Sequence, residues 1–130
     1  MPIIYTAQFI KDKEDLLKKF PPKHDKVFAH HSTIAFKPRS LDGIEMGRES
    51  KMKIIARAWD EKGDTLLVDN PKSQNENPHI TISCAKDVPP TYSNELLKNA
   101  VANHTLQYMD PPEEIEVIEG YFDGIRDVKS

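Results

Sequence analysis

A chain of 130 residues is long enough to form one domain with its own hydrophobic core, and we find no linker that would divide residues 1–130. Hydrophobic residues make up 38% and charged residues 30% of the sequence, and no apolar run approaches the length of a membrane span, so we expect no membrane association. The net charge of −3 argues against tight, sequence-independent binding of long nucleic acid, because that affinity comes mainly from neutralising phosphates.

The N-terminal part of the chain predicts a strand, a helix and a second strand. Residues 3–10 are rich in β-branched and aromatic side chains, which favour a strand. Asp12 is placed to cap a helix over residues 13–20, and a proline pair directly after this helix would end it. The next strand is expected over residues 26–36.

The middle of the chain predicts a hairpin between two polar loops. The hairpin strands are expected over residues 51–60 and 65–69, with a turn that uses Gly63 as a residue suited to a positive φ. The loops over residues 38–50 and 70–78 are the segments we expect to be most mobile.

The C-terminal part predicts one strand, one helix and a β-rich tail. Residues 79–84 form the strand, and Ser93 is the expected N-cap of the helix that follows. Residues 113–125 offer one or two strands, interrupted by Gly120 and Gly124. This order of elements favours an α+β fold: a mainly antiparallel, two-lobed sheet with a central cleft, helices packed on its outer faces and a loose internal duplication.

Two of the predicted strands begin with the same pattern of histidine, any residue, threonine and an apolar residue. The pattern includes His31 and Thr33 in the first strand, and His79 and Thr81 in the second. Because side chains alternate between the faces of a strand, each histidine shares a face with its threonine, ~7 Å away. If the strands lie side by side, the four side chains converge and can cradle a phosphate between a proton donor and a proton acceptor. This is the chemistry of forming or opening a cyclic phosphodiester.

The alternation of faces also selects among neighbouring residues. It places His30, Ser32 and Phe36 on the core side of the first strand, which makes His31 rather than His30 the candidate for the site. In the second strand it places Cys84 in the core, where a thiol is inert. A single cysteine cannot form a disulfide within the chain, which agrees with a reducing compartment and a cytoplasmic protein.

The paired His-x-Thr-apolar strands resemble the signature of the two-histidine (2H) phosphoesterase superfamily. This superfamily includes RNA 2′,3′-cyclic phosphodiesterases, the cyclic phosphodiesterase domain of tRNA ligases, RNA ligase-like enzymes and 2′,5′-oligonucleotide phosphodiesterases. The literal match covers the two tetrapeptides, and the order of elements extends it more loosely over most of the chain. The interval between the motifs is shorter than expected for the superfamily, so the connection between the lobes must be compact.

The resemblance implies a phosphodiesterase that acts on a 2′,3′-cyclic phosphate or a 2′,5′-linked nucleotide without a metal or other cofactor. In one assignment of roles, His79 is the general base and His31 is the general acid, and the sequence does not decide which histidine has which role. Thr33 and Thr81 would hold the phosphate and stabilise the charge that develops on its oxygens. The expected partner is a nucleotide or an RNA end, bound by a monomer.

Two other functions use the same groups. One is a non-catalytic module that binds nucleotides or phosphate ends, and the other is RNA end joining by the reverse reaction. Turnover of cyclic and 2′,5′-linked substrates would separate the enzyme from the module.

Three further residues are weaker candidates for contacts with the substrate. Lys37 follows the first motif strand on the predicted cleft side and could reach a phosphate or a base. Tyr5 and Tyr121 could stack on a base. A zinc site is not expected, because neither motif has a further histidine, cysteine or carboxylate on the cleft face, and zinc needs three or four protein ligands.

Overall fold

The strands form one curled, antiparallel sheet with two helices packed on it. The computed structural model describes residues 3–129, and within this range the 8-stranded sheet has the order β2-β6-β5-β4-β7-β1-β3, with β8 paired to β7. All the strand pairs are antiparallel, which confirms the predicted α+β class and the predicted type of sheet. The elements are β1 (Tyr5–Ile10), α1 (Lys13–Lys19), β2 (Lys26–Val27), β3 (His31–Phe36), β4 (Glu49–Trp59), β5 (Gly63–Asp69), β6 (His79–Cys84), α2 (Tyr92–Asn103), β7 (Gln107–Phe122) and β8 (Asp127–Val128).

The two ends of the sheet meet because its terminal strands, β2 and β3, are consecutive in the chain. Between them, the N–H groups of Phe28 and Ala29 donate to Ile82 (2.8 Å) and Thr81 (2.9 Å) of β6. Ala29 has a left-handed φ of 50°, and it divides the strand predicted over residues 26–36 into β2 and β3. The curl therefore brings the two motif strands, β3 and β6, close together.

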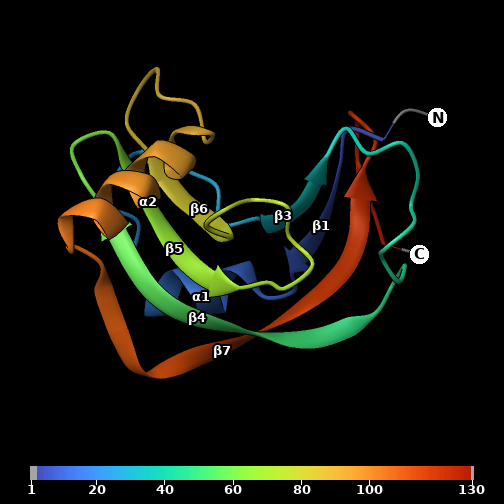
Figure 1. Ribbon diagram of the computed structural model, residues 1–130, viewed down its shortest axis with the longest axis horizontal. Helices are drawn as coiled ribbons and strands as arrows, with labels where there is room; N and C mark the ends of the chain where they lie inside the picture. Colours follow the sequence, from blue (N-terminus) through green and yellow to red (C-terminus); the bar gives the residue numbers. More distant parts are fainter. Residues whose placement is uncertain (1–2, 130) are drawn as a thin grey trace.

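Two long strands connect the halves of the molecule. Figure 1 shows β4 and β7 running from the half that carries β5, β6 and α2 to the half that carries β1 and the chain ends. β7 pairs with β4 between Gln107 and Ile118, and from Val117 to Phe122 it pairs with β1 on its other edge. The halves are thus joined by continuous backbone, and this gives the two-lobed form expected from the sequence.

The two helices cover opposite faces of the sheet. On β5, the buried side chains of Leu66 and Val68 belong to the larger core, which also contains Leu16 of α1. Leu67 lies between them on the strand and packs instead against the smaller cluster that contains Leu97 of α2. Because successive side chains of a strand alternate, α1 and α2 lie on different sides of β5.

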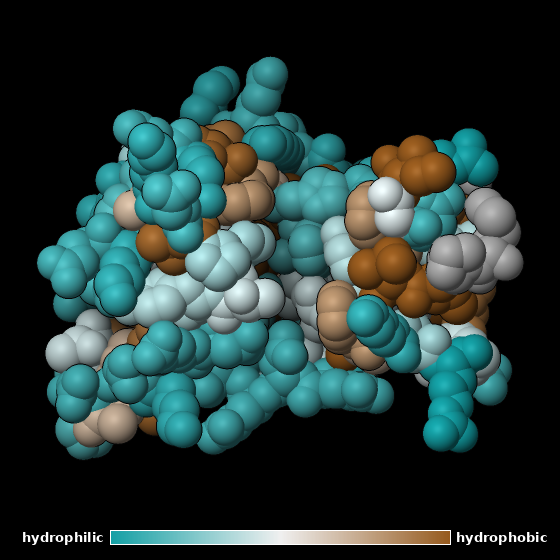
Figure 2. Space-filling view, turned by 90° about the horizontal axis from the view of Figure 1, so that it is seen from above, coloured by the Kyte–Doolittle hydropathy of each residue, from teal (hydrophilic) through white to brown (hydrophobic). Residues whose placement is uncertain are grey.

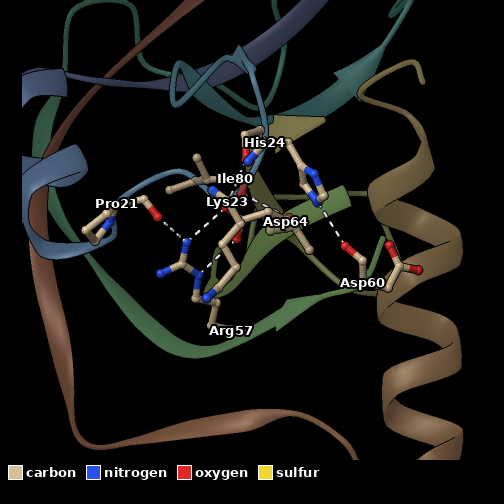
Figure 3. A network of polar contacts seen from close by, with 9 residues as sticks. Pro21, Lys23, His24, Arg57, Asp60, Asp64 and Ile80 are labelled. Atoms are coloured by element: carbon tan, nitrogen blue, oxygen red, sulfur yellow. Dashed lines mark hydrogen bonds and ion pairs between the residues drawn. The ribbon is translucent and has the colours of Figure 1, made fainter. Parts of the chain in front are cut away.

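A buried ion pair fastens the segment between α1 and β2 to the sheet. The guanidinium of Arg57 (β4) binds both carboxylate oxygens of Asp64 (β5) at 2.9 Å and donates to the Pro21 carbonyl at 2.7 Å, as Figure 3 shows. Asp64 also accepts from the backbone N–H of Lys23 (3.1 Å) and from the hydroxyl of Ser83 (2.9 Å). The carboxylate of Asp64 is fully buried, and these donors satisfy it. The network fixes where the chain enters β2 and hence β3.

Several local expectations need correction. Asp12 does cap α1, with its carboxylate accepting from the N–H of Asp15, but the N-cap of α2 is Thr91 rather than Ser93. Gly63 does not have a positive φ; glycine is needed there because a Cβ would lie 2.8 Å from the ring of Tyr92. Gly120 does not interrupt β7, which begins well before residue 113. No helix within residues 3–129 is long and apolar enough to cross a membrane.

Candidate active site

The motif residues lie on the face of the sheet opposite α1. On β6, Ile80 and Ile82 are buried in the core that contains α1, so His79 and Thr81 project to the other face. On β3, His31 is paired with Phe9 of β1, and Phe9 is adjacent to Ile10, which belongs to the same core. His31 therefore also points away from α1. The space-filling view shows a hollow between the α2 half and the half that carries the chain ends, with mostly hydrophilic walls (Figure 2).

His31 is enclosed by other rings. The ring of Tyr5 stacks on it, with centroids 4.4 Å apart and an interplanar angle of 17°. The hydroxyl of Tyr5 lies 3.4 Å from Nδ1 of His31, and Nδ1 of His30 lies 2.8 Å from the same atom. Phe9 packs beside both imidazoles, with its centroid 5.3 Å from His30 and 6.0 Å from His31. The orientation of the His31 ring is thus fixed on several sides.

This enclosure keeps His31 neutral. Burial, together with the positive charges that His30 and His79 can carry, lowers the pKa of His31 to about 3. Burial, together with the charge of Asp127, raises the pKa of Tyr5, so its hydroxyl stays protonated. At neutral pH, His31 therefore carries a hydrogen on one ring nitrogen and can accept another on the second.

His79 is held by a backbone carbonyl. Its Nδ1 lies 2.8 Å from the carbonyl oxygen of Asn77, and only an N–H can make this bond. Nε2 is thus the nitrogen available to a substrate. Burial lowers the pKa of His79, while the Asn77 carbonyl acts in the opposite direction because it stabilises the protonated ring.

The two motif threonines have different surroundings. Within residues 3–129 the Thr33 hydroxyl makes no hydrogen bond to the protein, and only its backbone carbonyl is bound, by the Ser73 hydroxyl at 2.8 Å. The Thr81 hydroxyl lies 2.8 Å from the hydroxyl of Ser93 on α2 and donates to the Pro90 carbonyl at 3.2 Å. Ser93 is a contact that the sequence did not suggest as part of the site, because its position favoured a role as N-cap.

The weaker candidates separate into one that joins the site and two that do not. Tyr5 contacts His31 directly. Tyr121 pairs with Thr6, whereas Phe122 pairs with Tyr5, so Tyr121 projects to the opposite face from Tyr5. Lys37 follows the end of β3 with a left-handed φ of 50°, and its ammonium lies 5.5 Å from the ring centre of Phe36 rather than against the histidines.

A β-bulge corrects the predicted faces of β3. The pairing of β1 with β3 shifts between Thr6 and Ala7, so Ala7 is opposite Thr33 while Thr6 is opposite Ala35. The extra residue turns Phe36 from the core side to the face of Tyr5, where it is 66% exposed. The same shift breaks the alternation that had placed Lys37 on the cleft side.

His30 also differs from its predicted position in the core. Its Nδ1 contacts His31, and its Nε2 lies 2.6 Å from the carboxylate of Asp127 on β8. The left-handed Ala29 before it interrupts the alternation of faces on which the prediction depended. The sequence does carry the adjacent pair of histidines, but it gives no sign that a residue so near the C-terminus completes their surroundings.

The arrangement provides acid–base groups and hydroxyl donors. Nowhere in residues 3–129 does the structure group three or more histidine, cysteine, aspartate or glutamate side chains in a way that could hold a metal. Two surface cavities lie away from the histidines, one beside Trp59 and the other beside Asn94. The histidine pair, rather than either cavity, concentrates the groups able to transfer protons.

Comparison with known families agrees with this chemistry. A family model described as the fungal tRNA ligase phosphodiesterase domain matches residues 7–118. The match includes both histidine motifs and spans most of the chain. No curated protein sequence matches the chain.

Proposed function

The chain belongs to the fungal tRNA ligase phosphodiesterase domain family, within the 2H phosphoesterase superfamily, and from this premise we propose that it hydrolyses RNA-type 2′,3′-cyclic phosphates through His31 and His79. The family assignment supports phosphodiesterase activity in RNA processing. The choice of substrate, the role of each residue and a cytoplasmic, monomeric state are our proposals. Nucleotides with 2′,5′ linkages are the second substrate class for the same groups.

The single observation that carries the proposal is the convergence of two histidines of lowered pKa on one face of the sheet. Hydrolysis of a cyclic phosphate needs a base that takes a proton from water and an acid that gives one to the departing ribose oxygen. One bond forms between the water oxygen and phosphorus, and one bond between phosphorus and a ribose oxygen breaks. A neutral imidazole would take the first proton, and the other imidazole would give the second after it has itself been protonated from solvent.

Hydroxyl groups are placed to stabilise the phosphate. Thr33 shares the face of His31, and its hydroxyl is free of protein partners within the described residues. Thr81 shares the face of His79 and can donate to a phosphate oxygen if it releases the Pro90 carbonyl. Charge that develops on the phosphoryl oxygens would thus meet donors already positioned by the strands.

Purified protein with a panel of cyclic and 2′,5′-linked substrates tests the proposal. We expect 2′,3′-cyclic phosphates to be opened, with His31→Ala and His79→Ala each lowering turnover by at least ~10²-fold and the double variant scarcely slower than either, because the two groups act as a unit. His104→Asn is the control, since this exposed histidine lies after α2 and asparagine tolerates its left-handed conformation. Binding without turnover would instead indicate a module for phosphate ends, and ligation of RNA ends would indicate the reverse reaction.

The same assay tests for a metal. We expect activity to persist in excess EDTA, because the hydroxyls and imidazoles would meet the phosphate charge. Loss of activity in EDTA that zinc or manganese restores would contradict the metal-independent mechanism.

A further inference from the structure

A line of polar contacts extends from His31 to the C-terminal strand. Asp127 lies 2.6 Å from Nε2 of His30, and Nδ1 of His30 lies 2.8 Å from Nδ1 of His31. The packing of Phe9 against both imidazoles keeps this geometry, and the ammonium of Lys129 lies over Phe9 at 5.4 Å. His31, His30 and Asp127 thus form one continuous series of polar contacts, although they come from two distant parts of the sequence.

The contacts determine where the protons lie. A carboxylate only accepts hydrogen bonds, so the nitrogen of His30 that faces Asp127 must carry a hydrogen. When His30 is neutral, its other nitrogen has a lone pair and Nδ1 of His30 can only accept, whereas a protonated His30 would donate from both nitrogens and place the hydrogen of His31 on Nε2. With His30 neutral, the short contact with His31 therefore needs a hydrogen on Nδ1 of His31. This leaves Nε2 of His31 with the lone pair that a general base needs.

We propose that His30 and Asp127 are positioning residues that hold His31 in the Nδ1–H tautomer and thereby make His31 the general base and His79 the general acid. The inference rests on the proposed hydrolysis at this same site. It reverses the assignment of roles that the sequence offered as one alternative.

The protons balance in this assignment. Water gives its proton to Nε2 of His31 as its oxygen bonds to phosphorus, and the imidazolium that forms keeps its Nδ1–H bond to His30. The carboxylate of Asp127 stabilises this positive charge through His30, as an acidic residue does behind a histidine base. His79 enters the step as the imidazolium, which the Asn77 carbonyl stabilises; its Nε2 gives a proton to the departing ribose oxygen, and the neutral ring that remains keeps its Nδ1–H bond to Asn77. Exchange with solvent then restores both histidines.

Nitrogen-15 NMR of labelled histidines reads the tautomer directly. At pH ~7 we expect His31 in the wild-type protein to be neutral with its hydrogen on Nδ1. Asp127→Asn removes the charge that holds the His30 hydrogen on Nε2; where its amide donates to this nitrogen, the His30 hydrogen moves to Nδ1 and His31 takes the Nε2–H form, so we expect a measurable Nε2–H population of His31 in this variant. A wild-type His31 that carries its hydrogen on Nε2 would overturn the inference.

Kinetics measure the consequence for catalysis. Asp127→Asn should lower kcat by ~10- to 100-fold or more with little change in KM, because it disturbs a proton acceptor rather than substrate binding. His30→Leu should have a similar effect, and His30→Asn should recover part of kcat because its carbonyl oxygen can accept from Nδ1 of His31. Asp42→Asn removes the same charge from an exposed loop and should behave as the wild type. A wild-type kcat in Asp127→Asn, or equal losses in His30→Leu and His30→Asn, would argue against a positioning role.

The outcomes separate this inference from the proposed function. A wild-type protein that turns over none of the substrates would contradict the proposed function, whereas the NMR measurement would still decide the tautomer of His31. His30→Leu and Asp127→Asn change segments that are distant in the sequence, so a folding defect in one variant leaves the other as the test.

Discussion

At the scale of single residues, the two half-buried motif histidines link the stability of the protein to pH. The pKa of His31 is lowered from 6.5 to about 3, and that of His79 is lowered as well. As the pH falls below 6.5, these residues take up protons in the unfolded chain before they do so in the folded one, so the free energy of unfolding decreases. Glu119 also has a lowered pKa, but its stabilising effect is lost only below its ordinary value of 4.5. Between pH 6.5 and 4.5, the loss of stability therefore reports on the histidines rather than on Glu119.

We therefore predict that His31→Asn makes stability less sensitive to mild acid. The wild type should lose up to about 2 kcal/mol of unfolding free energy from this residue between pH ~6.5 and ~5, and the variant should lose correspondingly less. Urea unfolding at both pH values measures the difference. His104→Asn is the control, because asparagine also tolerates the left-handed conformation of this residue (φ 56°). An equal loss of stability in the wild type and in His31→Asn would contradict the pKa shift.

The two threonines are expected to respond differently to removal of their hydroxyls. Thr33→Val should raise the activation barrier by about 2–4 kcal/mol with little effect on stability, because its hydroxyl has no protein partner within residues 3–129. Thr81→Val should also lower stability by about 1–3 kcal/mol, since it leaves the buried Ser93 hydroxyl without its partner. Turnover rates and thermal unfolding of both variants test this. Thr33→Ser should recover activity, and normal turnover by Thr33→Val would make Thr33 an ordinary strand residue.

At the scale of elements, β8 depends on a glycine in β7. A Cβ at Gly120 would lie 2.1 Å from the carbonyl oxygen of Val128, so Gly120→Ala must displace β8. Because β8 carries Asp127, we expect kcat to fall and the exchange of backbone amides over residues 125–129 to increase. Gly43→Ala is the comparison: it strains a positive φ of 91° but meets nothing within 4 Å, so it should cost stability without lowering kcat. A wild-type kcat in Gly120→Ala would show that the position of β8 does not affect catalysis.

Elements defined by local patterns were predicted well, whereas those defined by distant contacts were not. The capping carboxylate of Asp12 and the alternation of Ile80 and Ile82 depend on neighbours in the sequence, and the structure confirms both. The bulge that exposes Phe36 depends on pairing with β1, where the Thr6 hydroxyl receives the Ala35 N–H. The contact of His30 with Asp127 joins residues that only the completed fold brings together. The two motifs thus predicted the core of the candidate site, and the surroundings of its histidines required the structure.

At the scale of the whole molecule, a buried carboxylate connects the two halves. Glu119 of β7 is 1% exposed and pairs with the ammonium of Lys72 (2.9 Å), which lies in the loop between β5 and β6. The same carboxylate accepts from the N–H of Glu45 (2.8 Å) and from the amide of Gln8 (3.3 Å). Both loops that were expected to be mobile are therefore anchored at one residue. The loop of Lys72 also continues along β3, where the N–H of Gln74 donates to Ile34 at 2.7 Å.

We predict that this ion pair fixes the spacing of the two motif strands. Glu119→Gln should lower the free energy of unfolding by about 2–3 kcal/mol, because Lys72 loses its charged partner in a mostly buried place. Lys72→Met should cost a similar amount by leaving the carboxylate unpaired, and the double variant should cost less than the sum of the two, as expected for residues in direct contact. Turnover should fall in both single variants at temperatures where they remain folded, since the loop that holds β6 against β3 is released.

A second ion pair in the same region provides the control for this experiment. Arg48 and Glu45 form an exposed pair at 3.3 Å, with 51% and 63% of their side chains accessible, so Arg48→Ala should change stability by less than about 1 kcal/mol and leave turnover unchanged. Urea unfolding and substrate turnover of the four variants complete the test. Additive losses in the double variant, or full activity in Glu119→Gln, would show that the halves keep their spacing through β4 and β7 alone. If the double variant loses less unfolding free energy than the sum of the single variants and turnover falls, the loop between β5 and β6 sets the distance between the motif histidines.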